Sequence, residues 1–250
     1  MSFVSRRTLI ARGLATAAGA SGLAVAARLA SRYGLIPPDH GGIYAPGETL
    51  TYAAQRILTR HSMAREFPRT LISQTPVANG RPLQQQDYLQ SQAAGFADWQ
   101  LQVDGMVARP VSFSLADLRK LPSRSQITHL ACEEGWSFIA EWTGVPLSVL
   151  LDAAGMPPNA KFVASYSMEK DALDSIDMAD ALHPQTLVTY GMNGGDLPVG
   201  HGGPLRLRVP RQLGYKSLKY LRRLTVTDDL KKLGRELSEP SPEYAWYAGI

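Results

Sequence analysis

A single thiol stands out among the side chains whose types could do chemistry. Cys132 is the only cysteine in the 250 residues, so it cannot form an internal disulfide. A lone cysteine is more often buried and inert than functional. Here, however, the carboxylates of Glu133 and Glu134 follow it, whereas a cysteine that only fills a core usually has aliphatic neighbours. These surroundings favour a functional thiol.

Three functional interpretations of Cys132 compete. A nucleophile needs a base, and His129 is badly placed because residues i and i+3 of a strand point to opposite faces. A zinc site needs further cysteines or clustered histidines, and the five histidines show no ligand spacing. A thiolate on a metal whose other ligands come from a cofactor needs no protein partner. This third interpretation fits a lone cysteine best.

Two later segments have the composition of anion-binding loops. The run 201–206 contains a Gly-Gly pair, which lets the backbone approach a ligand closely, and ends on Arg206, a bidentate donor to phosphate. The run 214–219 adds the hydroxyl of Ser217 and the cation of Lys219. Taken alone, the first run is equally compatible with a plain turn and the second with a solvated surface turn.

The elements that must position these groups are short and mixed in type. Helical spacing and alternation predict helices over 49–62, 114–118, 146–154 and 176–182, and strands over 99–105, 126–131, 161–166, 186–192, 205–209 and 220–227. Strand and helix do not alternate regularly, so the sequence predicts an α+β fold of mixed sheets with short helices and long loops. The strand 126–131 would deliver Cys132 to a loop.

The body of the chain carries no net charge. Residues 1–30 contain four arginines and no acid, whereas residues 31–250 hold 22 basic and 22 acidic side chains. A basic footprint for nucleic acid is therefore absent, and we expect no nucleic-acid partner.

The N-terminus has the pattern of an export signal. Arg6-Arg7 precedes the uncharged residues 13–27, a stretch too short and too weakly apolar for a confident membrane span. The pattern resembles a twin-arginine signal, which exports proteins that fold and load a cofactor before crossing the membrane. The alternative is an ordinary amphipathic N-terminal helix.

Taken in order, the motifs resemble those of the oxidoreductase molybdopterin-binding family, which has the sulfite-oxidase fold. The matching segments are 132–137, 142–147, 181–187, 192–194, 197–198, 201–207 and 213–220. The resemblance runs from about residue 98 to the C-terminus, and it is specific because several motifs recur in order. The most similar members are exported bacterial proteins, which include a periplasmic methionine-sulfoxide reductase.

The resemblance implies one molybdenum–molybdopterin per chain, with Cys132 as the protein's metal ligand. Glu134 matches an acidic residue near the metal and is the second catalytic candidate. His201 stands where the reductase has an amide, so we expect its hydrogen bonding to change with pH. By position, the residues implied to contact the pterin or its phosphate are Asn79, Ser167, His201, Arg206, Ser217 and Lys219.

The departures from the family pattern bear on the substrate. Sulfite oxidases of animals and plants have an arginine a few residues after the ligating cysteine, and this stretch has Glu134 instead. A carboxylate beside the metal would repel sulfite. We therefore expect an exported molybdenum enzyme that reduces a sulfoxide- or N-oxide-type substrate by oxygen-atom transfer. A sulfite oxidase-like dehydrogenase and a non-catalytic exported binding protein on the same fold are the alternatives.

The same reasoning predicts partners and organisation. The chain has no Cys-x-x-Cys-His motif, so it should carry no haem and take electrons from a membrane subunit with b-type haem. The substrate would be a small-molecule or protein-bound oxidised group. The twin-arginine machinery would deliver a monomer to the periplasm, tethered to the membrane if the signal is kept. We expect an export signal over 1–30, a linker and N-terminal extension over 31–97, and the molybdopterin-binding oxidoreductase domain over 98–250.

Overall fold

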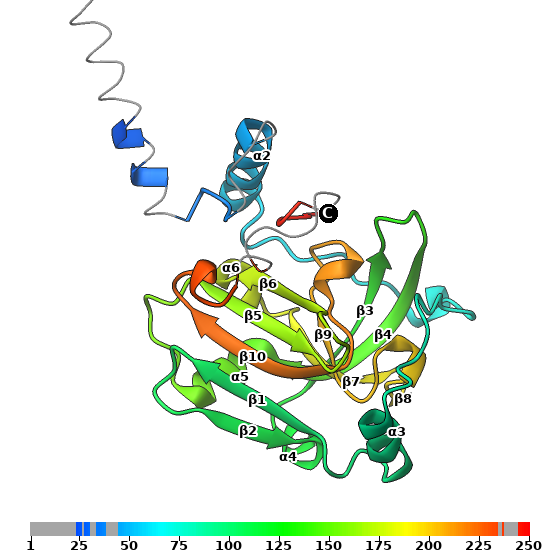
Figure 1. Ribbon diagram of the computed structural model, residues 1–250. Coiled ribbons are helices and arrows are strands. Elements are labelled where there is room, and N and C mark those ends of the chain that lie inside the picture. Colours follow the sequence, from blue (N-terminus) through cyan, green and yellow to red (C-terminus); the bar gives the residue numbers. More distant parts are fainter. Residues whose placement is uncertain (1–23, 27, 31–33, 39–44, 235–236, 238–244) are drawn as a thin grey trace, which may run out of the picture.

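Two five-stranded sheets form the body of the computed structural model, which describes residues 24–26, 28–30, 34–38, 45–234, 237 and 245–250 (Figure 1). The predicted export signal over 1–30 lies almost entirely outside these residues. The mixture of strands with short helices confirms the predicted α+β fold. Among the residues described, no helix is both long and apolar enough to cross a lipid bilayer.

The first sheet has the order β2-β1-β10-β5-β6. Its strands are β1 (Gln100–Gly105), β2 (Val111–Ser114), β5 (Phe162–Ser167), β6 (Leu173–Asp177) and β10 (Leu221–Thr227). β10 lies between β1 and β5, and its pairing with β1 is parallel, with Gln102 opposite Arg223. Strands from the two ends of the domain therefore meet at the centre of this sheet.

The second sheet has the order β3-β4-β7-β8, with β9 paired to β7. Its strands are β3 (Arg124–Ala131), β4 (Ser137–Pro146), β7 (Leu187–Met192), β8 (Gly195–Asp196) and β9 (Arg206–Arg208). β3 and β4 form an antiparallel hairpin in which Ala131 is opposite Ser137. The predicted strand 126–131 is confirmed, and the loop that follows it holds Cys132.

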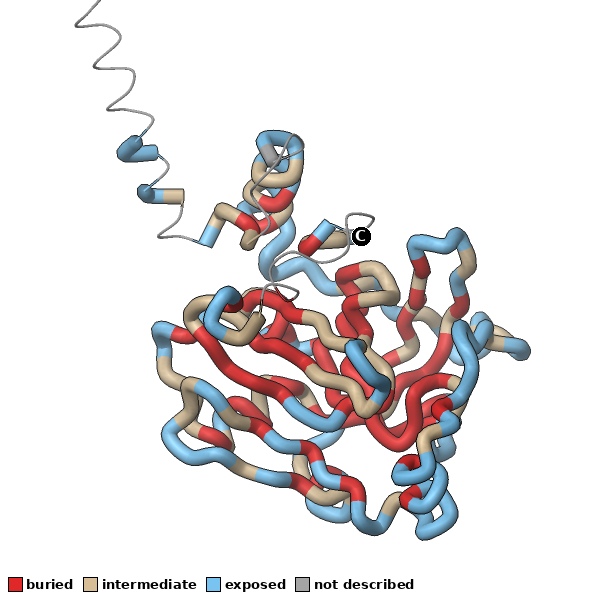
Figure 2. The backbone as a smooth tube through the Cα atoms, viewed as in Figure 1, coloured by how far each residue is buried: buried red, intermediate tan, exposed pale blue. Residues whose placement is uncertain are grey.

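Short helices cover the sheets and fill the core. They are α2 (Ala45–Leu58), α3 (Gln86–Ala93), α4 (Leu115–Lys120), α5 (Leu147–Ala154) and α6 (Met178–Ala181). α5 buries Leu147, Leu150 and Leu151 in the main apolar cluster, as its helical spacing predicts. α4 begins at the predicted cap, where the hydroxyl of Ser114 accepts from the backbone N–H of Asp117. Figure 2 shows that the interior strands are almost wholly buried.

The N-terminal helix differs from its prediction. The helix expected over 49–62 begins at Ala45 and ends at Leu58. Its aliphatic residues Leu50, Ile57 and Leu58 are exposed and do not enter the core. The buried side of α2 carries Tyr52, whose ring packs in a small apolar cluster with Trp246 and whose hydroxyl donates to Asp177 Oδ2 at 2.7 Å.

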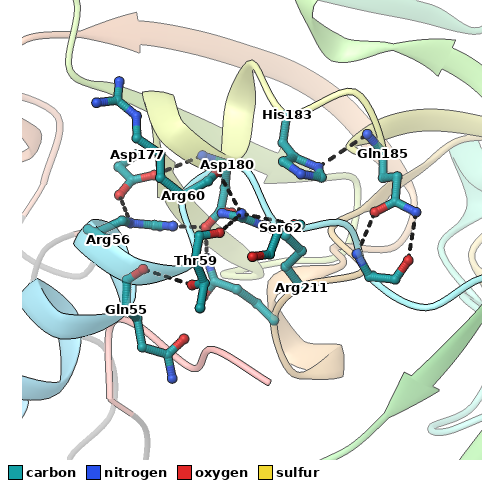
Figure 3. A network of polar contacts seen from close by, with 12 residues as sticks. Gln55, Arg56, Thr59, Arg60, Ser62, Asp177, Asp180, His183, Gln185 and Arg211 are labelled. Atoms are coloured by element: carbon teal, nitrogen blue, oxygen red, sulfur yellow. Dashed lines mark hydrogen bonds and ion pairs between the residues drawn. The ribbon is translucent and has the colours of Figure 1, made fainter.

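A buried ionic network fixes α2 to the body (Figure 3). Arg56 lies 2.7 Å from Asp177 Oδ2 through Nε and 2.6 Å from Asp180 Oδ2 through Nη2. Arg211 Nη2 lies 2.6 Å from Asp180 Oδ1, and Gln212 Nε2 donates to the other oxygen of that carboxylate. All four charged side chains of this network, those of Arg56, Asp177, Asp180 and Arg211, are buried. The segment before β1 is thus part of the folded body through charge pairing.

Candidate functional site

Cys132 lies in the loop that joins β3 to β4. Its backbone N–H donates to the carbonyl of Trp136 at 2.9 Å, which extends the hairpin ladder by one bond, and the N–H of Gly135 donates to the Cys132 carbonyl at 3.1 Å. Gly135 has φ +89°, a left-handed conformation that a side chain would strain. The loop geometry thus fixes the cysteine backbone tightly.

Two carboxylates surround the sulfur of Cys132. Sγ donates to Oε2 of Glu133 at 3.1 Å and lies 3.9 Å from Oε2 of Glu134. Burial, with a smaller contribution from these carboxylates, raises the pKa of the thiol to about 11. The free thiol is therefore protonated at neutral pH, and a bound cation would have to displace that proton.

An aromatic pair lines the loop beside the thiol. The indole Nε1 of Trp136 donates to Glu134 Oε2 at 2.6 Å and holds that carboxylate in place. The Trp136 ring is nearly parallel to Phe138, at 9° and 6.1 Å between centroids, and Phe138 meets the ring of His201 edge-on at 5.6 Å. These contacts bring His201 to the cysteine-bearing hairpin, 69 positions away in sequence.

His201 does not titrate near neutral pH. Burial, reinforced by the cations of Arg206 and Lys219, lowers its pKa to about 4. The expectation that its hydrogen bonding changes with pH therefore fails above about pH 5, because the imidazole stays neutral there.

Two buried arginines of β9 form a cationic centre. Arg206 donates through Nε to the Ser217 carbonyl at 2.9 Å and through Nη1 to the His201 carbonyl at 3.1 Å. Arg208 donates through Nη2 to the His129 carbonyl at 2.6 Å. Burial lowers the pKa of Arg206 to about 10 and that of Arg208 to about 9, and a thiolate at Cys132 would lie close enough to raise the pKa of Arg206. Both remain cationic at neutral pH.

The cations have no carboxylate partner in the described part of the chain. No ion pair within 4 Å involves Arg206, Arg208 or Lys219. The Nε of Arg208 is buried without a hydrogen bond, and both guanidinium groups lie over the ring of Trp142, 5.4 and 5.6 Å from its centroid. Unpaired buried charge is costly, so the cluster is built to receive an anion.

Lys219 joins three distant segments at one point. Its Nζ donates to the carbonyls of Asn79 and Gly200, the latter at 2.8 Å. Burial and the Arg206 cation lower the pKa of Lys219 to about 8. Gly202 has φ +98°, and a Cβ there would lie 2.7 Å from Cβ of Lys219. The Gly-Gly run is therefore required for the lysine to pack against it.

The lysine-bearing turn also contacts the cysteine loop. A Cβ on Gly214 would lie 3.2 Å from the carbonyl oxygen of Ala131 and 3.7 Å from Cα of Cys132. Cys132, the 201–206 run and the 214–219 run, which the sequence analysis treated as separate motifs, thus converge in space. Within the described residues, no three His, Cys, Asp or Glu side chains gather closely enough to hold a metal ion.

The two serines are placed differently from the charged groups. The hydroxyl of Ser217 is buried and accepts from the backbone N–H of Val209 at 3.1 Å, so it holds the turn together. Ser167 ends β5 opposite Leu221, and its hydroxyl accepts from the N–H of Glu169 at 2.9 Å. Within the described residues, the Ser167 side chain forms no hydrogen bond with the other predicted site residues.

Sequence reasoning missed three members of this site. Arg208 and Trp142 complete the cationic centre, and Trp136 holds Glu134. A signal for Arg208 was present, because a strand with two arginines at i and i+2 next to a Gly-Gly run places both on one face.

Comparisons with known proteins bear on the family of the chain. The profile of the family described as "Oxidoreductase molybdopterin binding domain" matches residues 88–233. A provisionally named protein-methionine-sulfoxide reductase subunit, YedZ1, of Azospira oryzae is 42% identical over 132 residues, 53% of this chain and 50% of that protein. The protein-methionine-sulfoxide reductase catalytic subunit MsrP of Ralstonia nicotianae is 31% identical over 167 residues, 61% of this chain and 50% of that protein.

A solved structure shares the fold. The crystal structure of the sulfane dehydrogenase SoxCD from Paracoccus pantotrophus superposes with a TM-score of 0.51 at 28% identity, covering 53% of this chain and 39% of that chain. The chain spans about half the length of the curated relatives it matches.

Proposed function

Because the chain belongs to the oxidoreductase molybdopterin-binding domain family, we propose that it is an exported oxidoreductase that reduces a sulfoxide- or N-oxide-type substrate. The observation that carries the proposal is one thiol, flanked by carboxylates, beside buried cations that lack a carboxylate partner. Two relatives bear the name of methionine-sulfoxide reductase subunits, which supports sulfoxide chemistry.

The residues present fit one molybdenum–molybdopterin per chain. Arg206 and Lys219, with Arg208 behind them, would hold the cofactor phosphate, because charge-assisted donors in a buried site bind phosphate strongly. Cys132 would bind the metal as a thiolate after losing its proton. The backbone at Asn79, whose carbonyl accepts from Lys219, and the neutral imidazole of His201 would line the pterin. The cofactor, once bound, supplies the two-electron chemistry.

The charge around the thiol favours a neutral substrate. Glu133 and Glu134 both lie within 4 Å of Sγ, and two carboxylates repel an oxyanion such as sulfite. The half-buried ring of Trp136, which stacks on the buried Phe138, is an apolar group beside them and suits the thioether part of a sulfoxide.

Glu134 is the group best placed to handle protons. Reduction of a sulfoxide to a thioether consumes two electrons and two protons and releases the oxygen as water. The carboxyl of Glu134, exposed at the loop and oriented by Trp136, would deliver a proton to that oxygen and regain one from solvent. The electrons would come from a membrane haem protein, since the chain has no haem-attachment motif. The protein would act in the periplasm as a monomer after export by the twin-arginine route.

Metal analysis tests the proposal directly. Full-length protein exported from a molybdenum-replete host should contain about one Mo per chain, and it should oxidise a reduced viologen dye when methionine sulfoxide is added. C132S should lose the thiolate-to-metal absorption and the turnover, whereas S125A, which removes an exposed hydroxyl from β3, the strand before the cysteine loop, should retain both. Protein without Mo would end the proposal. Rapid oxidation of sulfite with an artificial acceptor would favour the dehydrogenase alternative, and binding of sulfoxide unchanged in C132S would favour the non-catalytic one.

A further inference from the structure

The amphipathic helix α2 is oriented opposite to the usual arrangement. Leu50, Ala54, Ile57 and Leu58 recur at i, i+4, i+7 and i+8, which places them on one helical face. A helix on a soluble body normally turns such a face to the core. Here Leu50, Ile57 and Leu58 are 71%, 65% and 79% exposed.

The ionic network explains why this orientation is stable. Arg56 of α2 binds the carboxylates of Asp177 and Asp180 (Figure 3). The hydroxyl of Tyr52 also donates to Asp177. Rotating the helix to bury its leucines would take Arg56 away from both carboxylates and leave Asp177 buried without a cation, which is strongly unfavourable. The fold therefore holds the apolar face outward.

The apolar surface extends beyond the helix. Met63 and Ile250 are 50% and 58% exposed, and a groove of about 320 Å³ lies between α2 and the C-terminal residues. Leu58, Met63, Tyr247 and Ile250 are among its lining residues. In Figures 1 and 2, α2 lies outside the sheets and carries exposed residues on its outer side. We call this surface the α2 face and define it by Leu50, Ala54, Ile57, Leu58, Met63 and Ile250.

Charge indicates what the α2 face contacts. From residue 49 to residue 65 the chain has three arginines and no acid, and of these Arg60 and Arg65 are exposed. Glu66, the next acid, is paired with Arg124. The first 65 residues hold eight arginines against two acids, and they include the uncharged apolar stretch 13–27. An apolar helical face with basic residues around it is the pattern of a helix that lies in the surface of an anionic bilayer.

We propose that the α2 face binds the surface of an anionic phospholipid membrane, with its apolar side chains in the acyl boundary and the neighbouring Arg60 and Arg65 at the headgroups. α2 follows the apolar stretch 13–27 closely in the sequence, so both segments would contact the same membrane. This inference does not depend on the cofactor or on the substrate proposed above.

Footprinting on vesicles provides the local test. Full-length protein is exposed to hydroxyl radicals with vesicles of phosphatidylcholine alone or with one-third phosphatidylglycerol, and oxidised residues are located by mass spectrometry. We expect several-fold less oxidation of Leu58 and Met63 on the anionic vesicles. Leu89 of α3 and Leu182, each 42% exposed elsewhere on the body, should be oxidised equally in both. Unchanged oxidation of Leu58 and Met63 on protein that sediments with the vesicles overturns the proposal.

Partitioning of variants provides the second test. I57Q/L58Q should reduce binding to anionic vesicles by about tenfold or more, because two apolar side chains leave the acyl boundary. L89Q, the same change at an exposed leucine of α3, should leave it unchanged. R60Q/R65Q should weaken binding only to the anionic vesicles, by roughly fivefold per charge. If I57Q/L58Q binds as the wild type does and instead converts a dimer to a monomer in sedimentation velocity, the face joins two copies of the chain and the membrane proposal is wrong.

Discussion

Replacing Asp180 by asparagine should destabilise the protein strongly. The carboxylate is fully buried and accepts from Arg56 Nη2 at 2.6 Å and from Arg211 Nη2 at 2.6 Å and Nε at 3.2 Å. D180N keeps the shape but removes the charge that neutralises two buried guanidinium groups. Removing one partner of a buried ion pair costs about 3–5 kcal/mol. Arg56 keeps Asp177 at 2.7 Å, so the lower end, about 3 kcal/mol, applies here.

Thermal unfolding measures this cost. For a chain of this size a loss of about 3 kcal/mol lowers Tm by roughly 6–12 °C. D152N, the same change at an exposed carboxylate of α5, should lower the free energy of unfolding by less than about 0.5 kcal/mol. Hydrogen exchange in α2 should accelerate in D180N, because the helix loses its main attachment.

The pH dependence gives the same residue a second signature. The Arg56 and Arg211 cations outweigh burial and hold the pKa of Asp180 below its ordinary 3.8. Its stabilising contribution is therefore complete above about pH 4 and is lost as the pH falls through the lower folded-state pKa. D180N should lack this acid-dependent loss. If D180N unfolds within 1 °C of the wild type, or if its acid profile is the same, the network does not hold α2 as argued.

Three further predictions concern the candidate site. R206M should fold but retain about tenfold to a hundredfold less cofactor, because a charge-assisted bond to phosphate is lost; molybdenum and pterin per chain measure this. W136F removes the 2.6 Å hydrogen bond to Glu134 and should lower kcat for sulfoxide more than it raises KM. Adding W136F to E134Q should cause no further loss of kcat, and additive losses would contradict the positioning role of Trp136. Because the folded-state pKa of His201 is about 4, this residue should lower the free energy of unfolding by roughly 3 kcal/mol as the pH falls from 6.5 to 4. Urea unfolding of H201Q across this pH range should lack that loss. A pH dependence of the unfolding free energy parallel to that of the wild type would contradict the prediction.

Local signals predicted much of the fold. The capping box at Ser114, the buried face of α5 and the strand leading to Cys132 all depend on neighbours within a few residues, so the sequence determines them. β4 was missed because its residues are buried on both faces, and this removes the alternation that marks a strand. The orientation of α2 could not be predicted, because its partners Asp177 and Asp180 lie more than 120 positions away.

The candidate site, like the fold, could be predicted from the sequence only in part. Cys132, Arg206, Lys219 and Asn79 were predicted as candidates, and the last two are now seen to share a hydrogen bond across 140 positions. Their roles toward a cofactor stay a proposal. Arg208 was missed because its meaning comes from burial without a counter-charge, and burial at a given strand position depends on which strands pair around it.

The parallel pairing of β1 with β10 has a consequence for biosynthesis. The middle strand of the first sheet is the last one translated, so β1 waits for more than a hundred further residues before its neighbour exists. Contacts this distant make folding slow. Arg206 and Lys219 come shortly before β10 in the chain, so the cationic centre and the central strand are completed close together and late in synthesis. A chain synthesised only as far as β8 has neither, so the loading of an anionic ligand at this centre must follow the synthesis of both.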